Sequence, residues 1–452
     1  MNIVDIITEK RDGRELSYDE IKYIVSGYTD GSVPDYQMSA FLMAVYFKGM
    51  TRAETIALTD IMKNSGDIVD LSSIKGIKVD KHSTGGVGDK TTLIVGPVAA
   101  ACGVPVAKMS GRGLGFTGGT VDKLSSIPGF RISLERDVFM ELVNSNGISV
   151  IGQTGHIAPA DKKIYALRDV TATVENLSLI TSSIMSKKLA AGSDAILLDV
   201  KCGSGAFMKT EENASKLAEL MVEIGNSAGR ETIALITDMN QPLGCAVGNS
   251  LEVMEAIDVL KGHGPSDITE ISVILAGYMI YLGKKADSPE EGIRMAENAL
   301  SDGSALEKFR TLVSGQGGDP AVTDDFSLMP HSSISLDVTA SEGGYVSSID
   351  AMKTGLASQH TGAGREKKDD EIDMSAGIIL RKKVGDSVKA GDVLCTVHSC
   401  DMEKAAAATA EMKAAFVILE DRPAVPELVK RVVTAGNIKQ IKTRKSSGGG
   451  QG

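Results

Sequence analysis

Apolar residues recur at helical spacing in the first part of the chain, over Asp19–Ser26 and over Tyr36–Gly49. Ser17 and Thr51 are each followed three residues later by a glutamate. This is the capping-box pattern that satisfies backbone N–H groups at the start of a helix. The pattern predicts that residues 1–65 are helical.

Short apolar runs alternate with helical segments between residues 76 and 155. The predicted strand cores are Ile77–Val79, Val104–Ala107 and Ser149–Ile151, and alternation of this kind is typical of a parallel sheet. The apolar stretch Leu93–Ala107 is fifteen residues long, short of the roughly 20 that span a bilayer. We interpret it as a buried helix followed by a buried strand.

The same alternation continues further along the chain. A helical stretch over 160–191 precedes an apolar strand, Ala195–Val200, a helix, Glu211–Gly225, and a strand, Thr232–Thr237. Helical patterns then fill 250–285 and 289–314. The pattern of apolar and polar residues changes near residue 330. There, short β-type runs separated by Gly-Asp turns predict a small all-β or α+β module. These runs are Ile334–Val338, Gly344–Ile349, Ile378–Lys382 and Val393–Val397.

Amino-acid composition argues against some classes of binding partner, nucleic acid above all. The 452-residue chain carries a net charge of −11 and has only 4% aromatic residues with no tryptophan, which argues against nucleic-acid binding. Five cysteines without metal-ligand spacing fit reduced thiols and a cytoplasmic location. Charged residues near the N-terminus argue against a secretory leader, and no segment predicts membrane insertion.

Two glycine-rich turns each follow a predicted strand and precede a predicted helix. The first spans residues 81–89 and the second spans 108–120. Glycine lets the backbone approach a ligand closely, and a helix N-terminus behind the turn favours an anion. Two turns of this kind predict one phosphate held from two sides, with candidate donors Lys81, Ser83 and Thr92 in the first and Lys108, Ser110 and Thr120 in the second.

A second set of polar residues lies in the helical stretch 160–191. Ser183 and Lys187 are four residues apart and share one helix face, and Arg168 precedes them beside Tyr165. Arginine, lysine and serine could together bind a planar ligand edge rich in carbonyl groups. Their spacing alone favours a solvated helix face over a ligand site.

Other motifs exclude some chemistry. The chain has no HExxH, Walker or spaced Cys/His pattern, so a catalytic transition metal is not predicted. The GxGxxG string over 113–118 lacks the surroundings of a dinucleotide-binding fold. His82 lies between two candidate phosphate donors and is therefore a candidate for a place near the reacting centre.

The second turn closely resembles the signature of the thymidine and pyrimidine-nucleoside phosphorylases. The matching string is Ser110-Gly111-Arg112-Gly113-Leu114-Gly115-x-Thr117-Gly118-Gly119-Thr120-x-Asp122-x-Leu124. The resemblance extends over nearly the whole chain and includes 81–89, 160–163, 165–170 and 183–188.

The resemblance implies a fold and an activity. It implies an α/β protein with a small all-helical lobe (1–65 and 160–193), a large α/β lobe with a mostly parallel central sheet (76–155 and 195–320), a C-terminal α+β module (330–433) and a flexible tail (434–452). It also implies a homodimer that uses the helical lobe for contacts. The implied reaction is reversible phosphorolysis of uridine, thymidine and deoxyuridine by inorganic phosphate, with no organic cofactor.

The resemblance also assigns residues to roles. Six residues match phosphate-binding positions: Lys81, Ser83, Thr92, Lys108, Ser110 and Thr120. Arg168, Ser183 and Lys187 match base-binding positions, with Tyr165 beside them, and His82, Arg168 and Lys187 are the implied catalytic residues. Lysine at position 108 favours acceptance of uridine as well as thymidine.

A structural potassium ion is a further implication, with ligands at Gly88, Leu243, Ala246 and Glu255. The chain departs from its relatives here, because Lys90 stands where they carry threonine and an ammonium cannot ligate a cation. The site could persist through the Lys90 backbone carbonyl, or the ammonium could point away. Phe116 and Ser125 are two other departures from the signature.

Two alternative functions remain open. An anthranilate phosphoribosyltransferase-like enzyme would share the fold type and a Gly-Thr-Gly-Gly loop, but it would use pyrophosphate with Mg²⁺. A non-catalytic nucleoside- or phosphate-binding protein is the other alternative. A metal requirement would favour the first alternative. Release of base without phosphate, or no release at all, would contradict the phosphorylase interpretation.

Overall fold

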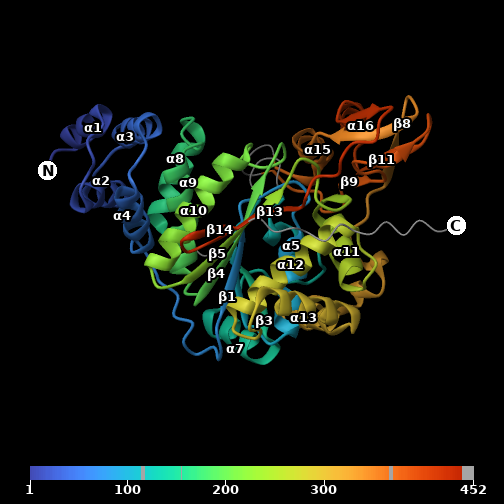
Figure 1. The fold of residues 1–452 in the computed structure, drawn as a ribbon, viewed down its shortest axis with the longest axis horizontal. Coiled ribbons are helices and arrows are strands. Elements are labelled where there is room, and N and C mark those ends of the chain that lie inside the picture. Colours follow the sequence, from blue (N-terminus) through green and yellow to red (C-terminus); the bar gives the residue numbers. More distant parts are fainter. Residues whose placement is uncertain (114–117, 154, 366–369, 440–452) are drawn as a thin grey trace.

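A computed structural model describes residues 1–113, 118–153, 155–365 and 370–439 of the chain. Phe116 and the end of the predicted tail, residues 440–452, lie outside the described residues. Figure 1 shows three parts: a helical lobe at the N-terminal side, a central sheet with flanking helices, and a C-terminal module at the opposite side.

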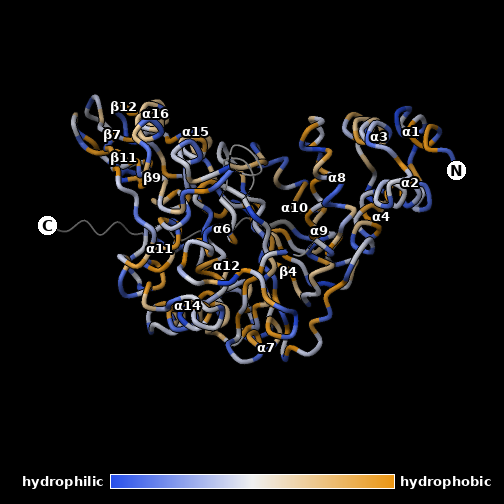
Figure 2. The backbone as a smooth tube through the Cα atoms, turned by 180° about the vertical axis from the view of Figure 1, so that it is seen from behind, coloured by the Kyte–Doolittle hydropathy of each residue, from blue (hydrophilic) through white to orange (hydrophobic). Residues whose placement is uncertain are grey.

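The helical lobe contains two groups of helices that are separated in the sequence. The first group is α1 (Ile3–Asp12), α2 (Tyr18–Asp30), α3 (Asp35–Lys48) and α4 (Arg52–Lys63), and the second is α8 (Pro159–Val170) and α9 (Leu177–Ala190). Hydrophobic and hydrophilic stretches alternate along these helices, and the hydrophobic faces share one buried core (Figure 2). Both predicted capping boxes are present, at Ser17 and at Thr51.

The central sheet is mostly parallel, as predicted. β1 (Val79–Ser83), β4 (Ala195–Cys202) and β5 (Glu231–Asp238) are parallel neighbours in that order. β13 (Val429–Thr434) continues the sheet antiparallel to β5, and β14 (Asn437–Lys439) follows it. β2 (Val106–Ser110) and β3 (Ile148–Gly152) form a separate parallel pair.

The predicted glycine turns begin later than expected. Lys81, His82 and Ser83 belong to β1, and Lys108 to Ser110 belong to β2. In β1 the polar residues keep sheet register, with Lys81 opposite Leu197 and Ser83 opposite Asp199. Charge at the end of a strand is tolerated here because buried acidic side chains lie beside it. The turns themselves therefore begin at Thr84 and Gly111.

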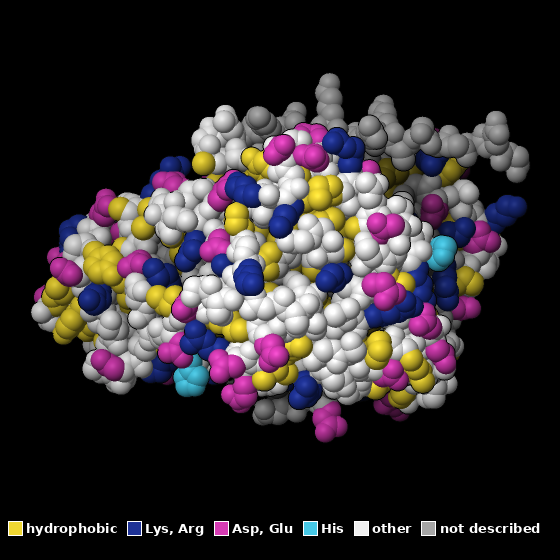
Figure 3. All heavy atoms as spheres, turned by 90° about the horizontal axis from the view of Figure 1, so that it is seen from below, with side chains coloured by type: hydrophobic (Ala, Val, Ile, Leu, Met, Phe, Trp, Pro, Cys, Tyr) yellow, Lys and Arg dark blue, Asp and Glu magenta, His cyan; other side chains and the backbone are white. Residues whose placement is uncertain are grey.

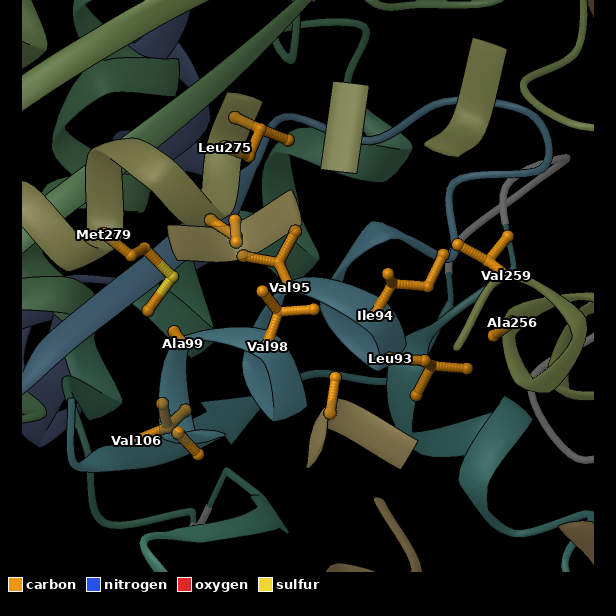
Figure 4. Packing of buried hydrophobic residues seen from close by; sticks show 14 of the residues in the cluster. Leu93, Ile94, Val95, Val98, Ala99, Val106, Ala256, Val259, Leu275 and Met279 are labelled. Carbon is orange, nitrogen blue, oxygen red and sulfur yellow. The ribbon is translucent and has the colours of Figure 1, made fainter. Parts of the chain in front are cut away.

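The largest apolar core lies between the central sheet and the helices packed on it. α5 (Thr91–Ala101) and α12 (Ser266–Leu282) are at its centre, and Figure 4 shows Val95 and Val98 of α5 packed toward Leu275 and Met279 of α12. The apolar run that we interpreted as a buried helix and strand is therefore α5 followed by β2. The remaining helices here are α6 (Thr120–Leu124), α7 (Arg136–Asn146), α10 (Glu211–Ser227), α11 (Asn249–Leu260), α13 (Pro289–Ser301) and α14 (Ser304–Gly315), with short helical turns η1 (Pro320–Thr323) and η2 (Phe326–Leu328).

The C-terminal module combines two small antiparallel sheets with helices. One sheet has the order β6-β9-β11-β7 and the other β10-β8-β12. Their bounds are β6 (Ala246–Gly248), β7 (Ile334–Thr339), β8 (Gly344–Ile349), β9 (Gly377–Leu380), β10 (Ser387–Val388), β11 (Val393–Ser399) and β12 (Phe416–Leu419), with helices α15 (Ala351–Ser358), η3 (Gln359–Ala363) and α16 (Met402–Lys413).

Two strands cross the boundary that the sequence suggested for this module. β13 lies at the end of the predicted module but pairs with β5 of the central sheet. Conversely, β6 comes from the α/β lobe and pairs with β9 of the module. Both pairings join residues far apart in the sequence, so local pattern could not predict them.

Among the described residues, no helix is both long and apolar enough to cross a bilayer. On the face shown in Figure 3, basic and acidic side chains are interspersed.

Candidate functional site

Lys81 lies at the end of β1 within a buried network of charges. Its ammonium is 3.3 Å from Asp199 Oδ2 and donates a hydrogen bond to Thr91 Oγ1. Lys201 also pairs with Asp199, at 2.8 Å. Burial by itself would raise the pKa of nearby Asp89, but Lys81 and Lys201 hold it well below its usual value. Lysine and aspartate side chains beside the first turn therefore neutralise one another in a buried cluster.

Lys108 and Lys188 share a single carboxylate. Lys108 Nζ lies 2.9 Å from Asp80 Oδ1, and Lys188 Nζ, on α9, lies 2.8 Å from Asp80 Oδ2. Lys108 also donates to the carbonyl oxygen of Lys81 at 2.6 Å. Burial lowers the pKa of Lys108 to about 7, with the positive charge of Lys188 also lowering it and Asp80 opposing both. Lys108 can therefore change its charge near neutral pH.

Several predicted phosphate donors are not engaged by the protein. The side-chain hydroxyls of Thr92, Ser110 and Thr120 have no hydrogen-bond partner in the described part of the chain, and all three residues are half-buried. Ser83 Oγ accepts a hydrogen bond from the backbone N–H of Gly85 at 3.2 Å. Free hydroxyl donors beside a glycine turn are suited to an oxygen-rich anion.

The two turns are linked to one another by side chains. Lys123 of α6, behind the second turn, donates to the carbonyl oxygen of Asp89 in the first turn at 2.7 Å, and it pairs with Glu252 of α11. Asp122 accepts from the Gly113 N–H at 2.7 Å. Arg365 of the C-terminal module reaches the same carboxylate at 3.3 Å. The turns are therefore held as one unit.

Glycine is required where the turns approach other backbone. A Cβ on Gly119 would lie 2.1 Å from the Gly113 nitrogen, and one on Gly88 would lie 2.5 Å from the Leu243 oxygen. Gly88 also has a φ of +73°. Any other residue at these positions would displace the loops.

Ser183 and Lys187 form the predicted pair on one face of α9. Lys187 Nζ lies 3.0 Å from Ser183 Oγ, and it also donates a hydrogen bond to Asp161 Oδ2 of α8. Asp161 is buried, whereas about a quarter of the Lys187 side chain stays exposed. The ammonium is thus positioned by two partners while remaining accessible.

Arg168 is more engaged than its predicted role suggests. The side chain is buried, and it donates to the carbonyl oxygens of Thr173 (3.2 Å), Leu179 (3.1 Å) and Val174 (2.7 Å). Its guanidinium lies 5.7 Å from the Tyr165 ring centre. Burial lowers the pKa of Arg168 to about 10. These bonds hold the α8–α9 connection, so only the remaining N–H groups are free for a ligand.

His82 is in β1, between Lys81 and Ser83 of the predicted phosphate-binding set. Its Nε2 atom is buried and has no hydrogen-bond partner within the described residues. Burial, followed by the positive charges of Lys188 and Lys108, lowers the pKa of His82 well below its usual value. Lys187 acts in the same direction, which places His82 within electrostatic reach of both lobes. The imidazole is therefore neutral at neutral pH and can offer a hydrogen bond, not a positive charge.

Three of the four expected potassium ligands accept a hydrogen bond from one side chain, and the fourth, the Gly88 carbonyl oxygen, accepts from the Lys90 backbone N–H at 2.9 Å. Lys90 Nζ lies 3.0 Å from Leu243 O and 2.9 Å from Ala246 O, and it donates a hydrogen bond to Glu255 Oε2. Burial by itself would lower the pKa of Lys90, but Glu255 and Glu252 raise it above its usual value. The ammonium does not point away, and a potassium ion does not fit among these oxygens while it is there.

Three family models match consecutive stretches of the chain. Residues 4–66 match the helical bundle domain of the glycosyl transferase family, and residues 75–306 match the a/b domain of that family. Residues 345–419 match the pyrimidine nucleoside phosphorylase C-terminal domain.

Full-length relatives agree with these matches. Pyrimidine-nucleoside phosphorylase from Geobacillus stearothermophilus is 58% identical over 399 residues, which are 88% of this chain and 92% of that protein. The enzyme of the same name from Bacillus subtilis (strain 168) is 57% identical over the same shares of each chain. The chain belongs to the pyrimidine-nucleoside phosphorylase family.

A solved structure supports the fold at greater distance. Anthranilate phosphoribosyltransferase from Thermus thermophilus aligns with a TM-score of 0.57 and 19% identity, covering 69% of this chain and 99% of that one. At this identity the likeness concerns the fold alone. Assignment to the family is therefore based on the sequence matches. Only the shared fold supports the alternative that the protein is a phosphoribosyltransferase.

Sequence reasoning missed the acidic partners of the site lysines. Asp80 pairs with Lys108, and Asp161 pairs with Lys187. Lys188 of α9 also pairs with Asp80. Asp80 directly follows the predicted strand core Ile77–Val79 and precedes Lys81, and an acidic residue between a buried strand and a lysine was an available signal. Asp161 lies in one of the stretches that carry the resemblance, with no role assigned to it there.

Proposed function

We propose that this protein catalyses the reversible phosphorolysis of pyrimidine nucleosides, with uridine, thymidine and deoxyuridine as substrates. The observation that carries this proposal is the pairing of two donor sets. The hydroxyls of Thr92, Ser110 and Thr120, which have no hydrogen-bond partner among the described residues, lie at the linked glycine turns, and Ser183 and Lys187 form a second donor pair on α9. The names of the relatives point to the same substrate class.

The first set suits inorganic phosphate as the nucleophile. A phosphate oxygen forms a bond to C1′ of the sugar while the C1′–N1 bond breaks and its electron pair leaves with the base. The proton of hydrogen phosphate passes to the departing base, giving free pyrimidine and α-pentose 1-phosphate. Because phosphate is already nucleophilic, the protein needs to position it, and positioning is a large source of rate.

The second set suits the departing base. Negative charge grows on the base as the bond breaks, and fixed donors aimed at it lower the barrier. Lys187 supplies a charge oriented by Asp161 and Ser183, and the remaining N–H groups of Arg168 supply hydrogen bonds beside Tyr165. Neutral His82 donates or accepts a hydrogen bond near the sugar and base.

The test is release of uracil from uridine, followed by absorbance, with and without phosphate. The expected result is release that requires phosphate and no divalent metal. A requirement for Mg²⁺ and pyrophosphate would instead favour the phosphoribosyltransferase alternative. Release without phosphate, or no release, would contradict the proposal.

Acceptance of the ribose substrate is assigned to Lys108. Its ammonium donates hydrogen bonds to Asp80 and to the Lys81 carbonyl oxygen, just before the first turn, and adds positive charge next to the proposed phosphate position. Lys108→Met should weaken phosphate use and uridine turnover. Uridine rates equal to those of the wild type would contradict this assignment.

The assembly proposed is a homodimer built on the helical lobe. Large apolar side chains are exposed on α1 and α3: Val4, Tyr36 and Phe47 are 55%, 73% and 76% exposed. A second copy of the lobe would cover them. Light scattering should give twice the chain mass, and Phe47→Glu should lower it toward one chain. We place the reaction in the cytoplasm, which the five unpaired cysteines support.

A further inference from the structure

Lys90 has the surroundings of a bound cation, not those of an ordinary ion pair. Its ammonium has three donors, and all three have oxygen partners: two backbone carbonyls, Leu243 O and Ala246 O, and the carboxylate of Glu255. The side chain is fully buried and Glu255 nearly so. Carbonyl and carboxylate oxygens together are the donor set of a hard cation.

The oxygens are held in place by the protein. Glu255 Oε1 accepts hydrogen bonds from the backbone N–H groups of Cys245 and Ala246, at 2.8 and 3.0 Å, which leaves Oε2 directed at Lys90. Gly244 has a φ of +69°, and a Cβ there would lie 2.2 Å from Glu255 Oε2 and 2.8 Å from Lys90 Nζ. The loop therefore closes tightly round a single positive charge.

We propose that the Lys90 ammonium is a tethered replacement for a structural monovalent cation, so that this protein holds its proposed phosphate site together without potassium. An ammonium group and a potassium ion carry the same charge and are similar in size. We call the oxygens of Leu243, Ala246 and Glu255 around the ammonium the cage. Because the lysine is part of the chain, its charge stays in the cage whatever salt is in solution.

The position of the cage explains what the charge does. Lys90 immediately precedes α5, whose first turn carries Thr92. Glu255 lies one turn along α11 from Glu252, which pairs with Lys123 behind the second glycine turn. α11 thus anchors one lysine just behind each turn. Lys90 is a positioning residue, and its expected effect on phosphate use rests on the proposed function.

The first experiment uses the wild-type protein and needs no activity. Thermal unfolding is measured in potassium chloride and in choline chloride at equal ionic strength. The expected result is the same melting temperature in both salts. A saturable rise in melting temperature that is specific to potassium would overturn the proposal, because it would show a cation site that Lys90 does not fill.

The second experiment removes the tether. Lys90→Thr opens the cage and leaves Glu255 without a positive partner, so its melting temperature should fall in choline chloride and rise saturably with added potassium. In the same variant, the KM for phosphate should be about fivefold higher in choline than in potassium, at the low end of typical coupling between sites. Lys90→Met fills the space with an uncharged side chain, and potassium should not restore it.

A matched control separates a cation cage from any buried lysine. Lys10 pairs with Glu54 in the helical lobe at 2.7 Å, is equally buried and has no backbone carbonyl among its hydrogen-bond partners in the described chain. Lys10→Thr should lose stability in both salts alike. A potassium response of Lys90→Thr no larger than that of Lys10→Thr would contradict the proposal. Unfolding data decide this even if the protein proves not to use phosphate.

Discussion

Lys188 on α9 and Asp80 on β1 form a buried ion pair of 2.8 Å between the helical lobe and the central sheet. The residue before it, Lys187, turns the other way and pairs with Asp161 inside the helical lobe. One helix therefore presents a lysine to each side: one for the proposed base site and one that ties this helix to the proposed phosphate site. Asp80 completes the link because it also holds Lys108.

Removing Lys188 should weaken both stability and the coupling of the lobes. Lys188→Met removes one of the two ammonium partners of Asp80, while Lys108 remains. The expected loss is therefore that of one hydrogen bond to a charged group, about 1.5–3 kcal/mol. Urea unfolding measures this loss, and Lys162→Met, an exposed lysine on α8, is the control. Because Lys188 lowers the pKa of Lys108, that pKa should rise in the variant. A variant as stable as the control would contradict the assigned role of the pair.

The charge on Lys108 should make phosphate use depend on pH. Its pKa of about 7 means that Lys108 is charged below that pH and neutral above it. The advantage of the wild type over Lys108→Met in kcat/KM for phosphate should therefore shrink as the pH rises through about 7. Taking this ratio cancels the ionisation of phosphate itself, which both proteins share. A ratio that stays constant with pH would show that the Lys108 charge is not used.

His82 should cost the folded protein stability in mild acid. Its pKa is well below the usual value because of burial and neighbouring lysines, so the unfolded chain takes up a proton that the folded chain refuses. Stability should fall as the pH drops below about 6.5, by up to about 1.4 kcal/mol per pH unit for one proton. Urea unfolding of His82→Asn across this range should show a slope smaller by up to that amount. An equivalent change in slope in His331→Asn, at an exposed histidine, would contradict the assignment.

Asp161 should act on the base and not on phosphate. Asp161→Asn removes the charge that orients Lys187, so kcat for uridine should fall by up to roughly 100-fold through loss of positioning, while the KM for phosphate stays close to the wild-type value. Steady-state kinetics with each substrate varied in turn separate the two effects. Asp169→Asn, at an exposed position on the same helix, is the matched control. A raised KM for phosphate with unchanged kcat would show that Asp161 acts on phosphate binding, and would contradict its assignment to the base.

Local features of the fold could be predicted from sequence. The capping boxes at Ser17 and Thr51, and the Ser183–Lys187 pair, depend on residues three or four positions apart, and all three are present. Strand ends were less predictable. Lys81 and Lys108 lie inside strands because their charges meet Asp199 and Asp80, which no local pattern shows.

By itself, the sequence determined the elements, the glycine turns and the family, because these follow from local spacing and long matching motifs. The tertiary structure decided which charges meet. Lys90 and Glu255 are 165 residues apart, and Lys188 and Asp80 are 108 apart. It also decided that β13 completes the central sheet. The physical reason is that a buried charge takes whichever partner the folded chain brings to it, and distance along the chain does not limit that choice.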